Sequence, residues 1–282
     1  MDAIAAIAGA AGVHLLNTSY EWGCTALAAP APTGDSARLL RTLDWPYPGL
    51  GRMVEVVRQK GAAGGFWNIT WPGAVGVLTA IAPGRFAAAI NQAPFERRVE
   101  AFDISTIDAA LNIWGVWRGD GRTPALHLLR QVFETAQDFA TARVLLEQTP
   151  IANPTIYSLV GLSPNESCII ERTRTGYFTR TGVASAANAW RYGEFPGRWQ
   201  EIGENGDDER RDSRERSEMI ERFAGQETGD FAWVEPPILN GYTRLAVEAD
   251  PKRKTLHLRG YEQSGPEAAL PATAILDLAL DD

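Results

Sequence analysis

Three residues near the start of the chain have types and spacing that suit nucleophilic catalysis. Cys24 stands in the stretch EWGCTAL, and Arg41 and Asp44 follow 17 and 20 residues later in RTLDW. A cysteine thiol becomes a strong nucleophile when it loses its proton, and a nearby cation favours that loss. The three residues together predict a cysteine nucleophile with a cation and a carboxylate beside it.

The base that serves this nucleophile is not evident among the histidines, because nothing in the sequence places one of the three beside Cys24. The cysteine's own α-amino group, whose ordinary pKa is about 7.7–8.0, is a suitable base once the Gly23–Cys24 bond is cleaved. Gly23 has no side chain to hinder attack of the Cys24 sulfur on its carbonyl carbon. The hypothesis is a nucleophile that frees itself, with Asp44 holding the amino group and Arg41 favouring the thiolate.

The elements that must position these residues are short strands and separate helices. Apolar or alternating segments bounded by turn residues predict six strands in 24–93, four in 155–188 and two in 243–262. Helical periodicity covers 105–148, and the charged segment 206–225 predicts an exposed helix. Strands and helices segregated in this way favour an α+β fold, with two antiparallel sheets packed together and helices outside, in one domain.

Pairing of the first two predicted strands brings Arg41 and Asp44 back to the level of Cys24. The two residues are three apart, so on a flat strand they face opposite sides. A bulge or a strand end between them is therefore expected if both side chains are to lie near one sulfur.

The composition limits the other functions open to the chain. Its 282 residues are 45% hydrophobic and 22% charged, which suits a folded domain with an ample core. A net charge of -8 gives no electrostatic reason to expect nucleic acid or an anionic membrane surface as a partner. Two cysteines form no disulfide framework and no zinc motif, and no nucleotide-binding or other cofactor motif is found. We expect no metal and no cofactor.

The first residues, MDAIAAIAGAAGVHLL, are apolar but lack the basic region of a secretory signal, and the run is too short to span a bilayer. We therefore expect a cytoplasmic protein without a transmembrane segment. Residues 1–23 are a candidate propeptide or N-terminal arm, and residues 24–282 are the expected catalytic domain.

The stretch CTALAA…RTLDW resembles the start of the mature catalytic chain in N-terminal-nucleophile cysteine amidohydrolases. This group includes acid ceramidase, N-acylethanolamine acid amidase, choloylglycine hydrolase and isopenicillin N acyltransferase. WPGAVGVLTAIAPGRFAAAINQAPF and ILNGYTRLAVEADPKRKTLHLRGYE resemble later segments of acid ceramidase, and the similarity runs over roughly residues 20–263. The resemblance implies a four-layer αββα sandwich, which agrees with the layers expected above.

The same resemblance implies further site residues. Asn91 matches an asparagine near the oxyanion site, and Asn188 matches a second asparagine of the family. The late arginine of the family maps to Arg210, with Arg211 one step away. Fixed donors at a carbonyl oxygen lower the barrier to amide cleavage. Gln92 stands where acid ceramidase has a glutamate, and a neutral amide lacks the carboxylate's charge, so the amide-hydrolase class follows from the resemblance but the substrate does not.

Each assignment has a structural alternative. Cys24, like Cys168, can be a core residue, and the arginine and aspartate of RTLDW can be a surface ion pair. The two asparagines can be turn residues, and Arg210 can belong to a solvated helix face. The sequence favours hydrolysis of a linear N-acyl amide through a Cys24 thioester. The predicted partner is a small-molecule amide, which can carry an apolar acyl group, and the chain can form a homo-oligomer. Acyl transfer to an amine and a non-catalytic, unprocessed binding domain of the same fold remain open alternatives.

Overall fold

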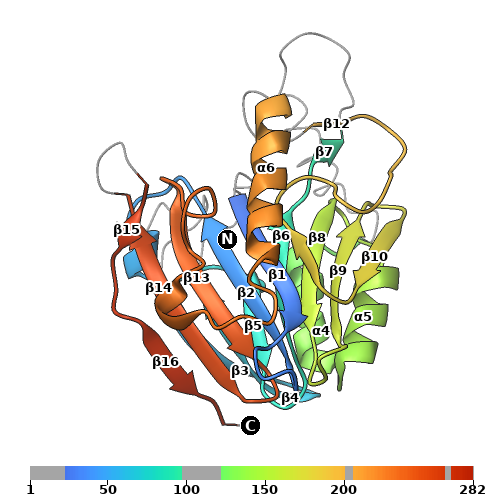
Figure 1. The fold of residues 1–282 in the computed structure, drawn as a ribbon. Helices are drawn as coiled ribbons and strands as arrows, with labels where there is room; N and C mark the ends of the chain where they lie inside the picture. Colours follow the sequence, from blue (N-terminus) through green and yellow to red (C-terminus); the bar gives the residue numbers. More distant parts are fainter. Residues whose placement is uncertain (1–22, 97–121, 201–205, 264–267, 282) are drawn as a thin grey trace.

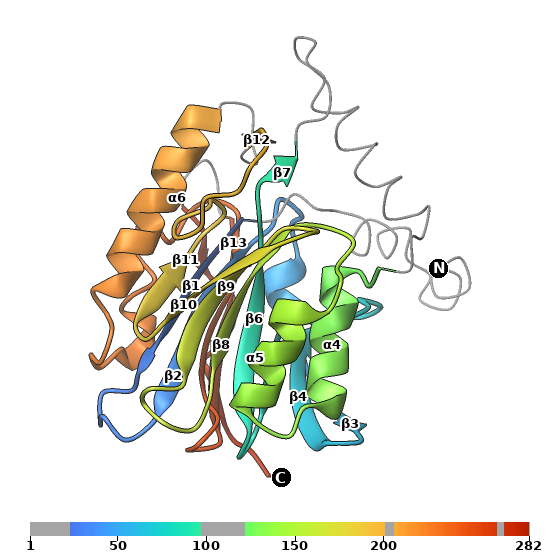
Figure 2. The same ribbon diagram turned by 90° about the vertical axis from the view of Figure 1, so that its right-hand side faces the viewer.

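Two antiparallel sheets packed face to face form the centre of the protein, and helices cover their outer faces (Figure 1). The structure, a computed structural model of the chain, describes residues 23–96, 122–200, 206–263 and 268–281. In Figure 2 the layers follow one another as helix, sheet, sheet and helices. The predicted α+β fold, an αββα sandwich, is confirmed.

The first sheet contains the strands that carry the candidate nucleophile. Its described part has seven strands, with β1 and β2 in the middle between β11 and β13, and with β15 and β16 both pairing with β14. The strands are β1 (Gly23–Pro30), β2 (Ala37–Asp44), β11 (Ala184–Ala186), β13 (Thr243–Asp250), β14 (Thr255–Glu262), β15 (Leu270–Pro271) and β16 (Leu276–Ala279).

The second sheet also has seven strands in its described part, in the order β10, β9, β8, β6, β5, β4, β3. The strands are β3 (Glu55–Gly61), β4 (Gly64–Thr70), β5 (Thr79–Ala82), β6 (Phe86–Gln92), β8 (Thr155–Val160), β9 (Ser167–Arg172) and β10 (Tyr177–Thr181). A separate two-stranded ribbon pairs β7 (Phe95–Glu96) with β12 (Trp199–Gln200). Because β7 follows directly on β6, this ribbon extends beyond the end of the second sheet (Figure 2).

The helices lie on the two outer faces. Helix α6 (Gly206–Glu221) packs on β1 and β11, whereas α4 (Ala125–Thr135) and α5 (Phe139–Gln148) pack on the second sheet. Asp138 caps α5, since its carboxylate accepts a 2.7 Å hydrogen bond from the amide of Thr141. Single 3₁₀ turns occur at η1 (Leu50–Arg52) and η2 (Gly229–Phe231). The helical pattern predicted around residues 105–117 lies outside the described residues.

The two faces of β1 and β2 point into two different cores. Cys24 and Leu43 belong to the core shared with the second sheet. Leu27 and Leu40 instead pack with Ile220 of α6 in a second cluster on the outer face. This alternation follows from the two-residue period of a strand, and it decides from which side each side chain can reach the nucleophile. Residues 1–22, most of the candidate propeptide, lie outside the described residues, so the boundary at Gly23 stays a prediction.

Candidate active site

The register of β1 and β2 brings the predicted residues together. Gly23 lies opposite Asp44, Cys24 opposite Leu43 and Ala26 opposite Arg41, in a ladder that is continuous to the far ends of both strands. A bulge or a strand end was expected at Arg41 and Asp44; this ladder contains no bulge, and β2 ends at Asp44. The two residues stay on opposite faces of the sheet. Arg41 contacts the Cys24 sulfur, whereas Asp44 lies against Gly23, the residue before Cys24.

Arg41 makes the direct contact with the candidate nucleophile. Its fully buried guanidinium donates from Nη2 to the Cys24 sulfur at 3.0 Å and to the Ile90 carbonyl at 2.9 Å, and from Nη1 to the Thr79 hydroxyl. Burial raises the pKa of the Cys24 thiol, and the charge and hydrogen bond of Arg41 oppose that rise. The alternative of a surface ion pair is therefore wrong for Arg41, which is a buried cation aimed at sulfur.

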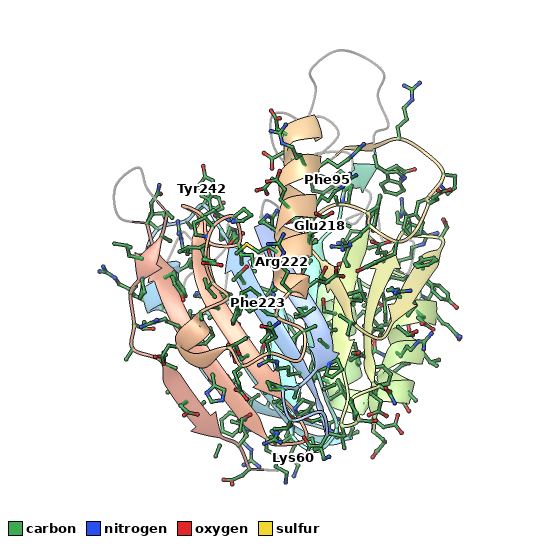
Figure 3. All side chains as sticks on the ribbon, in the orientation of Figure 1. Lys60, Phe95, Glu218, Arg222, Phe223 and Tyr242 are labelled. Atoms are coloured by element: carbon green, nitrogen blue, oxygen red, sulfur yellow. The ribbon has the colours of Figure 1, made fainter. Side chains whose placement is uncertain are left out.

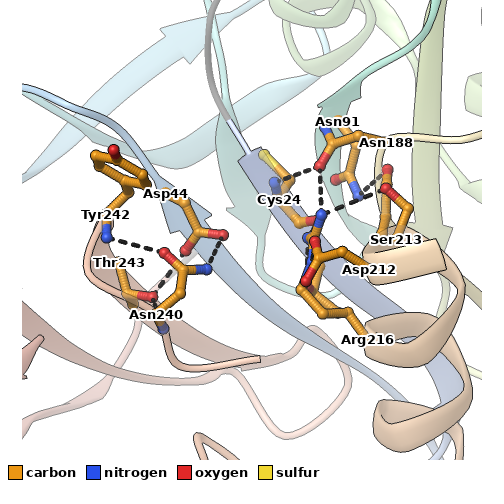
Figure 4. Close-up of polar contacts among 12 residues, drawn as sticks. Cys24, Asp44, Asn91, Asn188, Asp212, Ser213, Arg216, Asn240, Tyr242 and Thr243 are labelled. Atoms are coloured by element: carbon orange, nitrogen blue, oxygen red, sulfur yellow. Dashed lines mark hydrogen bonds and ion pairs between the residues drawn. The ribbon is translucent and has the colours of Figure 1, made fainter. Parts of the chain in front are cut away.

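Asn188 binds the backbone of the nucleophile (Figure 4). Its Oδ1 accepts a 2.9 Å hydrogen bond from the Cys24 amide, and its Nδ2 donates to the Gln92 carbonyl at 2.9 Å. The position follows from the pairing of β1 with β11. Ala26 lies opposite Ala186, so continuing this register by two residues sets Asn188 beside Cys24.

Asn91 joins the two sheets next to the site. It lies on β6, is fully buried, and donates from Nδ2 to the carbonyl oxygens of Ala186 and Ala187, both at 3.1 Å. Within the described residues its buried Oδ1 has no hydrogen-bond partner. The adjacent Gln92 is also buried, and its carbonyl is the one that Asn188 binds. These contacts place both β6 residues at the site, and the oxyanion role of Asn91 stays a prediction.

The arginine of α6 that reaches the site is Arg216, and the mapping to Arg210 is thereby corrected. Arg216 is buried and donates from Nη1 to the Cys24 carbonyl at 2.6 Å and to the Thr25 hydroxyl at 3.0 Å. Its Nη2 donates to Asn188 Oδ1 at 3.2 Å. Arg210 is exposed on the same helix.

Arg211 is exposed as well, and its 2.8 Å ion pair joins it to Asp208 of the same helix. The solvated helix face is thus the correct description of the two arginines that the sequence singled out. The helical period around Ile220 is the sequence pattern from which the burial of Arg216 could have been predicted. Ile220 is buried in the outer core, and Arg216 lies one turn before it on the same face, whereas Arg210 lies on another.

Asp44 lies against the backbone just before the nucleophile. It is 4% exposed, and its oxygens accept hydrogen bonds from Asn240 Nδ2 and Thr243 Oγ1, each at 2.9 Å (Figure 4). Burial raises the pKa of this carboxyl, while the charge of Arg216 and the two hydrogen bonds oppose the rise. A β-carbon at Gly23 would lie 3.0 Å from Asp44 Oδ2, so glycine allows this close approach.

The site lies at one end of the sandwich. Figure 3 labels Tyr242, which lies two residues after Asn240 in the chain, and Phe95 of β7 at the same end of the molecule, with Lys60 at the opposite end.

Cys168, on β9, is fully buried, and burial raises its pKa to about 12, which fits the predicted core role.

The described ranges hold no group of three or more histidine, cysteine, aspartate and glutamate side chains that could bind a metal ion. The same part of the chain has no helix long and apolar enough to cross a membrane.

No protein-family profile matches the chain. Among curated proteins, the N-acylethanolamine-hydrolyzing acid amidase of Mus musculus is 26% identical over 197 residues, which is 68% of this chain and 48% of that protein. The protein of the same name from Rattus norvegicus is 27% identical over 199 residues, with the same shares. The chain spans about half the length of the curated relatives it matches.

Solved structures show the same fold. The Caenorhabditis elegans ortholog of N-acylethanolamine-hydrolyzing acid amidase superposes with a TM-score of 0.59 at 17% identity, covering 81% of this chain and 93% of that one. A mutant of the conjugated bile acid hydrolase from Clostridium perfringens gives 0.51 at 10% identity, covering 92% and 97%. The resemblance to N-terminal-nucleophile amidohydrolases that the sequence predicts is confirmed by these relatives and by this fold.

Proposed function

We propose that the chain is an amidohydrolase of the N-terminal-nucleophile type, which hydrolyses the C–N bond of linear N-acyl amides with Cys24 after cleavage of the Gly23–Cys24 bond. The observation that carries the proposal is the 3.0 Å contact of Arg41 Nη2 with the Cys24 sulfur. A buried guanidinium fixed on a thiol by two further acceptors is an arrangement that stabilises a thiolate. The names of the curated relatives support an N-acyl amide as the substrate class.

The self-cleavage step uses groups that already surround Cys24. The sulfur attacks the Gly23 carbonyl carbon, the new S–C bond replaces the C–N bond, and the thiol proton passes to the departing nitrogen. Water then hydrolyses the thioester, which leaves a Gly23 carboxylate and a Cys24 with a free thiol and a free amino group. Asn188 Oδ1 holds the nitrogen that departs, and Arg41 stabilises the sulfur that attacks.

The amidase reaction repeats this chemistry on an external substrate. The amino group of Cys24 accepts the thiol proton, and the sulfur attacks the acyl carbonyl carbon. The tetrahedral intermediate collapses when its C–N bond breaks and the proton passes to the leaving amine. Water attacks the resulting thioester and releases the acid. A second amine in place of water gives acyl transfer, so the acceptor decides between hydrolysis and transfer.

Cys24→Ala tests the proposal, with Cys168→Ala as the matched control at the other buried cysteine. Intact-mass measurement of the wild-type protein and the Cys168→Ala variant should show loss of the first 23 residues, whereas Cys24→Ala stays full-length. A panel of N-acyl amides of increasing acyl length should be hydrolysed by the first two proteins and not by the third.

Hydrolysis by the Cys24→Ala variant would refute the nucleophile. A wild-type chain that stays full-length and does not react with a thiol-directed acylating probe would favour the non-catalytic binding domain. Formation of a new amide when a second amine is added, in place of the free acid, would assign acyl transfer.

A further inference from the structure

The turn from Asn240 to Thr243 binds Asp44 with two donors from one short segment. Asn240 Nδ2 donates to Asp44 Oδ2 and Thr243 Oγ1 donates to Asp44 Oδ1 (Figure 4). Both oxygens of the carboxylate are thus held from the same side. Neither donor stands out in the sequence as a site residue, and neither contacts Cys24 in the described contacts.

The other contacts of the turn fix which atoms face Asp44. Asn240 Oδ1 accepts from the Tyr242 amide at 2.8 Å, so the amino group of the side chain is the part that faces the carboxylate. Thr243 Oγ1 accepts from the Asn240 amide at 3.0 Å, so its hydrogen is directed to Asp44. A group that faces two donors is satisfied as an ionised carboxylate, whereas a protonated one would set its own O–H against a donor.

The turn is itself anchored to the end of β2. The Trp45 amide donates to the Tyr242 carbonyl at 2.7 Å, and Thr243 pairs with Asp44 in the β2–β13 ladder. A bulge between Thr243 and Leu245 inserts Arg244, which donates to the Tyr47 carbonyl at 2.9 Å. A bulge re-aims side chains next to it, and here it separates the register of the turn from that of the rest of β13.

The charged and titratable groups around Asp44 come from three elements. Helix α6 contributes Arg216, which favours the ionised carboxylate, and Asp212, which disfavours it. Cys24 faces Asp44 from β1, and Arg244 faces it from β13. Burial opposes ionisation more than any of these groups. The two neutral donors of the turn therefore stabilise the ionised form of Asp44 against the cost of its burial.

We propose that Asn240 and Thr243 are positioning residues that hold Asp44 ionised and aimed at the start of β1, where it receives the amino group that cleavage creates on Cys24. This inference rests on the proposed function for its consequence in catalysis. The carboxylate already lies against Gly23, the residue that leaves. Neither positioning residue takes part in bond making or breaking.

Thr243→Val tests the inference, because it removes the hydroxyl and keeps the shape, while Thr243→Ser keeps the hydroxyl. The matched control is Thr42→Val, since Thr42 is a buried threonine of β2 whose hydroxyl has no partner among the described residues. A hydrogen bond to a charged group contributes enough to move the acid limb of the kcat/KM–pH profile upward by about one pH unit in Thr243→Val. Thr243→Ser and Thr42→Val should keep the wild-type limb.

A second measurement does not depend on activity. Full-length Cys24→Ala protein labelled with ¹³C at the aspartate carboxyls, with the Asp44 signal assigned through Asp44→Asn, reports the ionisation of Asp44 directly. Addition of Thr243→Val or Asn240→Ala should raise the pH at which Asp44 titrates, and Asn240→Ala serves if Thr243→Val fails to fold. An unchanged Asp44 titration in the folded variants would overturn the inference. If the titration moves but the wild-type chain neither cleaves itself nor hydrolyses amides, the positioning role stands and the proposed function fails.

Discussion

Replacement of Arg41 by lysine tests whether the guanidinium controls the reactivity of Cys24. Arg41 spans three acceptors, the Cys24 sulfur, the Ile90 carbonyl and the Thr79 hydroxyl. A guanidinium presents its donors in a rigid fork, whereas an ammonium is a compact charge on a flexible stem. Lysine keeps the positive charge and loses the geometry, so the variant isolates the hydrogen bond to sulfur.

The expected size of the effect follows from the contact that is lost. Burial raises the pKa of the Cys24 thiol, and Arg41 is the largest influence that lowers it. Without the contact the pKa rises, so the thiolate fraction near neutral pH falls. A hydrogen bond to a charged group contributes about 1.5–3 kcal/mol. At about 1.4 kcal/mol for each factor of ten, kcat/KM at neutral pH should fall roughly 10- to 100-fold.

The assay is the pH dependence of kcat/KM for an N-acyl amide that the wild-type protein hydrolyses. Arg41→Lys should regain activity as the pH rises, because hydroxide restores the thiolate that the guanidinium no longer stabilises. Arg85→Lys is the matched control, since Arg85 is a partly buried arginine that donates to the carbonyls of Phe133, Ala136 and Gly65 outside the site. A folded Arg41→Lys protein with the wild-type rate and pH profile would refute the role assigned to the guanidinium.

Two further predictions concern the helix and the core. Arg216→Met should slow loss of the first 23 residues by roughly tenfold or more, because the Cys24 carbonyl and its neighbours lose their donor. Arg210→Met should be processed at the wild-type rate. Equal time courses of the two variants, measured by intact mass, would contradict the corrected assignment. Tyr157→Phe should lower the free energy of unfolding by about 1 kcal/mol, because the hydroxyl that binds the Ala125 carbonyl at 3.0 Å is lost. Denaturant unfolding measures this, and an unchanged midpoint would show that the anchor of α4 contributes nothing.

The strands and layers were predictable because each element has a local pattern of apolar and polar residues. All twelve predicted strands are present in the structure. The segregation of helices from strands predicted two packed sheets with helices outside, and the resemblance implied the αββα order that the structure has. Four short strands were missed, β7, β12, β15 and β16. The last two have no buried face to produce a pattern, and both leucines that begin them are exposed. The pairing of β1 with β11 and of β2 with β13 joins distant parts of the chain, and no local signal specifies such partners.

The site residues that lie close to Cys24 in the sequence were easier to predict than those that lie far from it. Arg41 was correctly placed beside Cys24, because β1 and β2 form a hairpin with a short turn. Arg216 was missed because the charged helix holds several arginines, and only the position of Ile220 identifies the buried face. Asn240 and Thr243 were missed because their contact with Asp44 depends on the pairing of distant strands and on a bulge.

Under the proposed mechanism, cleavage of the Gly23–Cys24 bond would change the number of hydrogen-bond acceptors that the Cys24 nitrogen needs. Before cleavage the nitrogen has one N–H, and Asn188 Oδ1 accepts it. Under the proposed mechanism, cleavage produces an amino group with additional N–H bonds, which need acceptors in a buried place. Asp44 is the proposed acceptor, because it pairs across the ladder with Gly23, the residue directly before that nitrogen. The two faces of strand β2 make this possible, since Arg41 donates to the sulfur from one face while Asp44 approaches the backbone from the other.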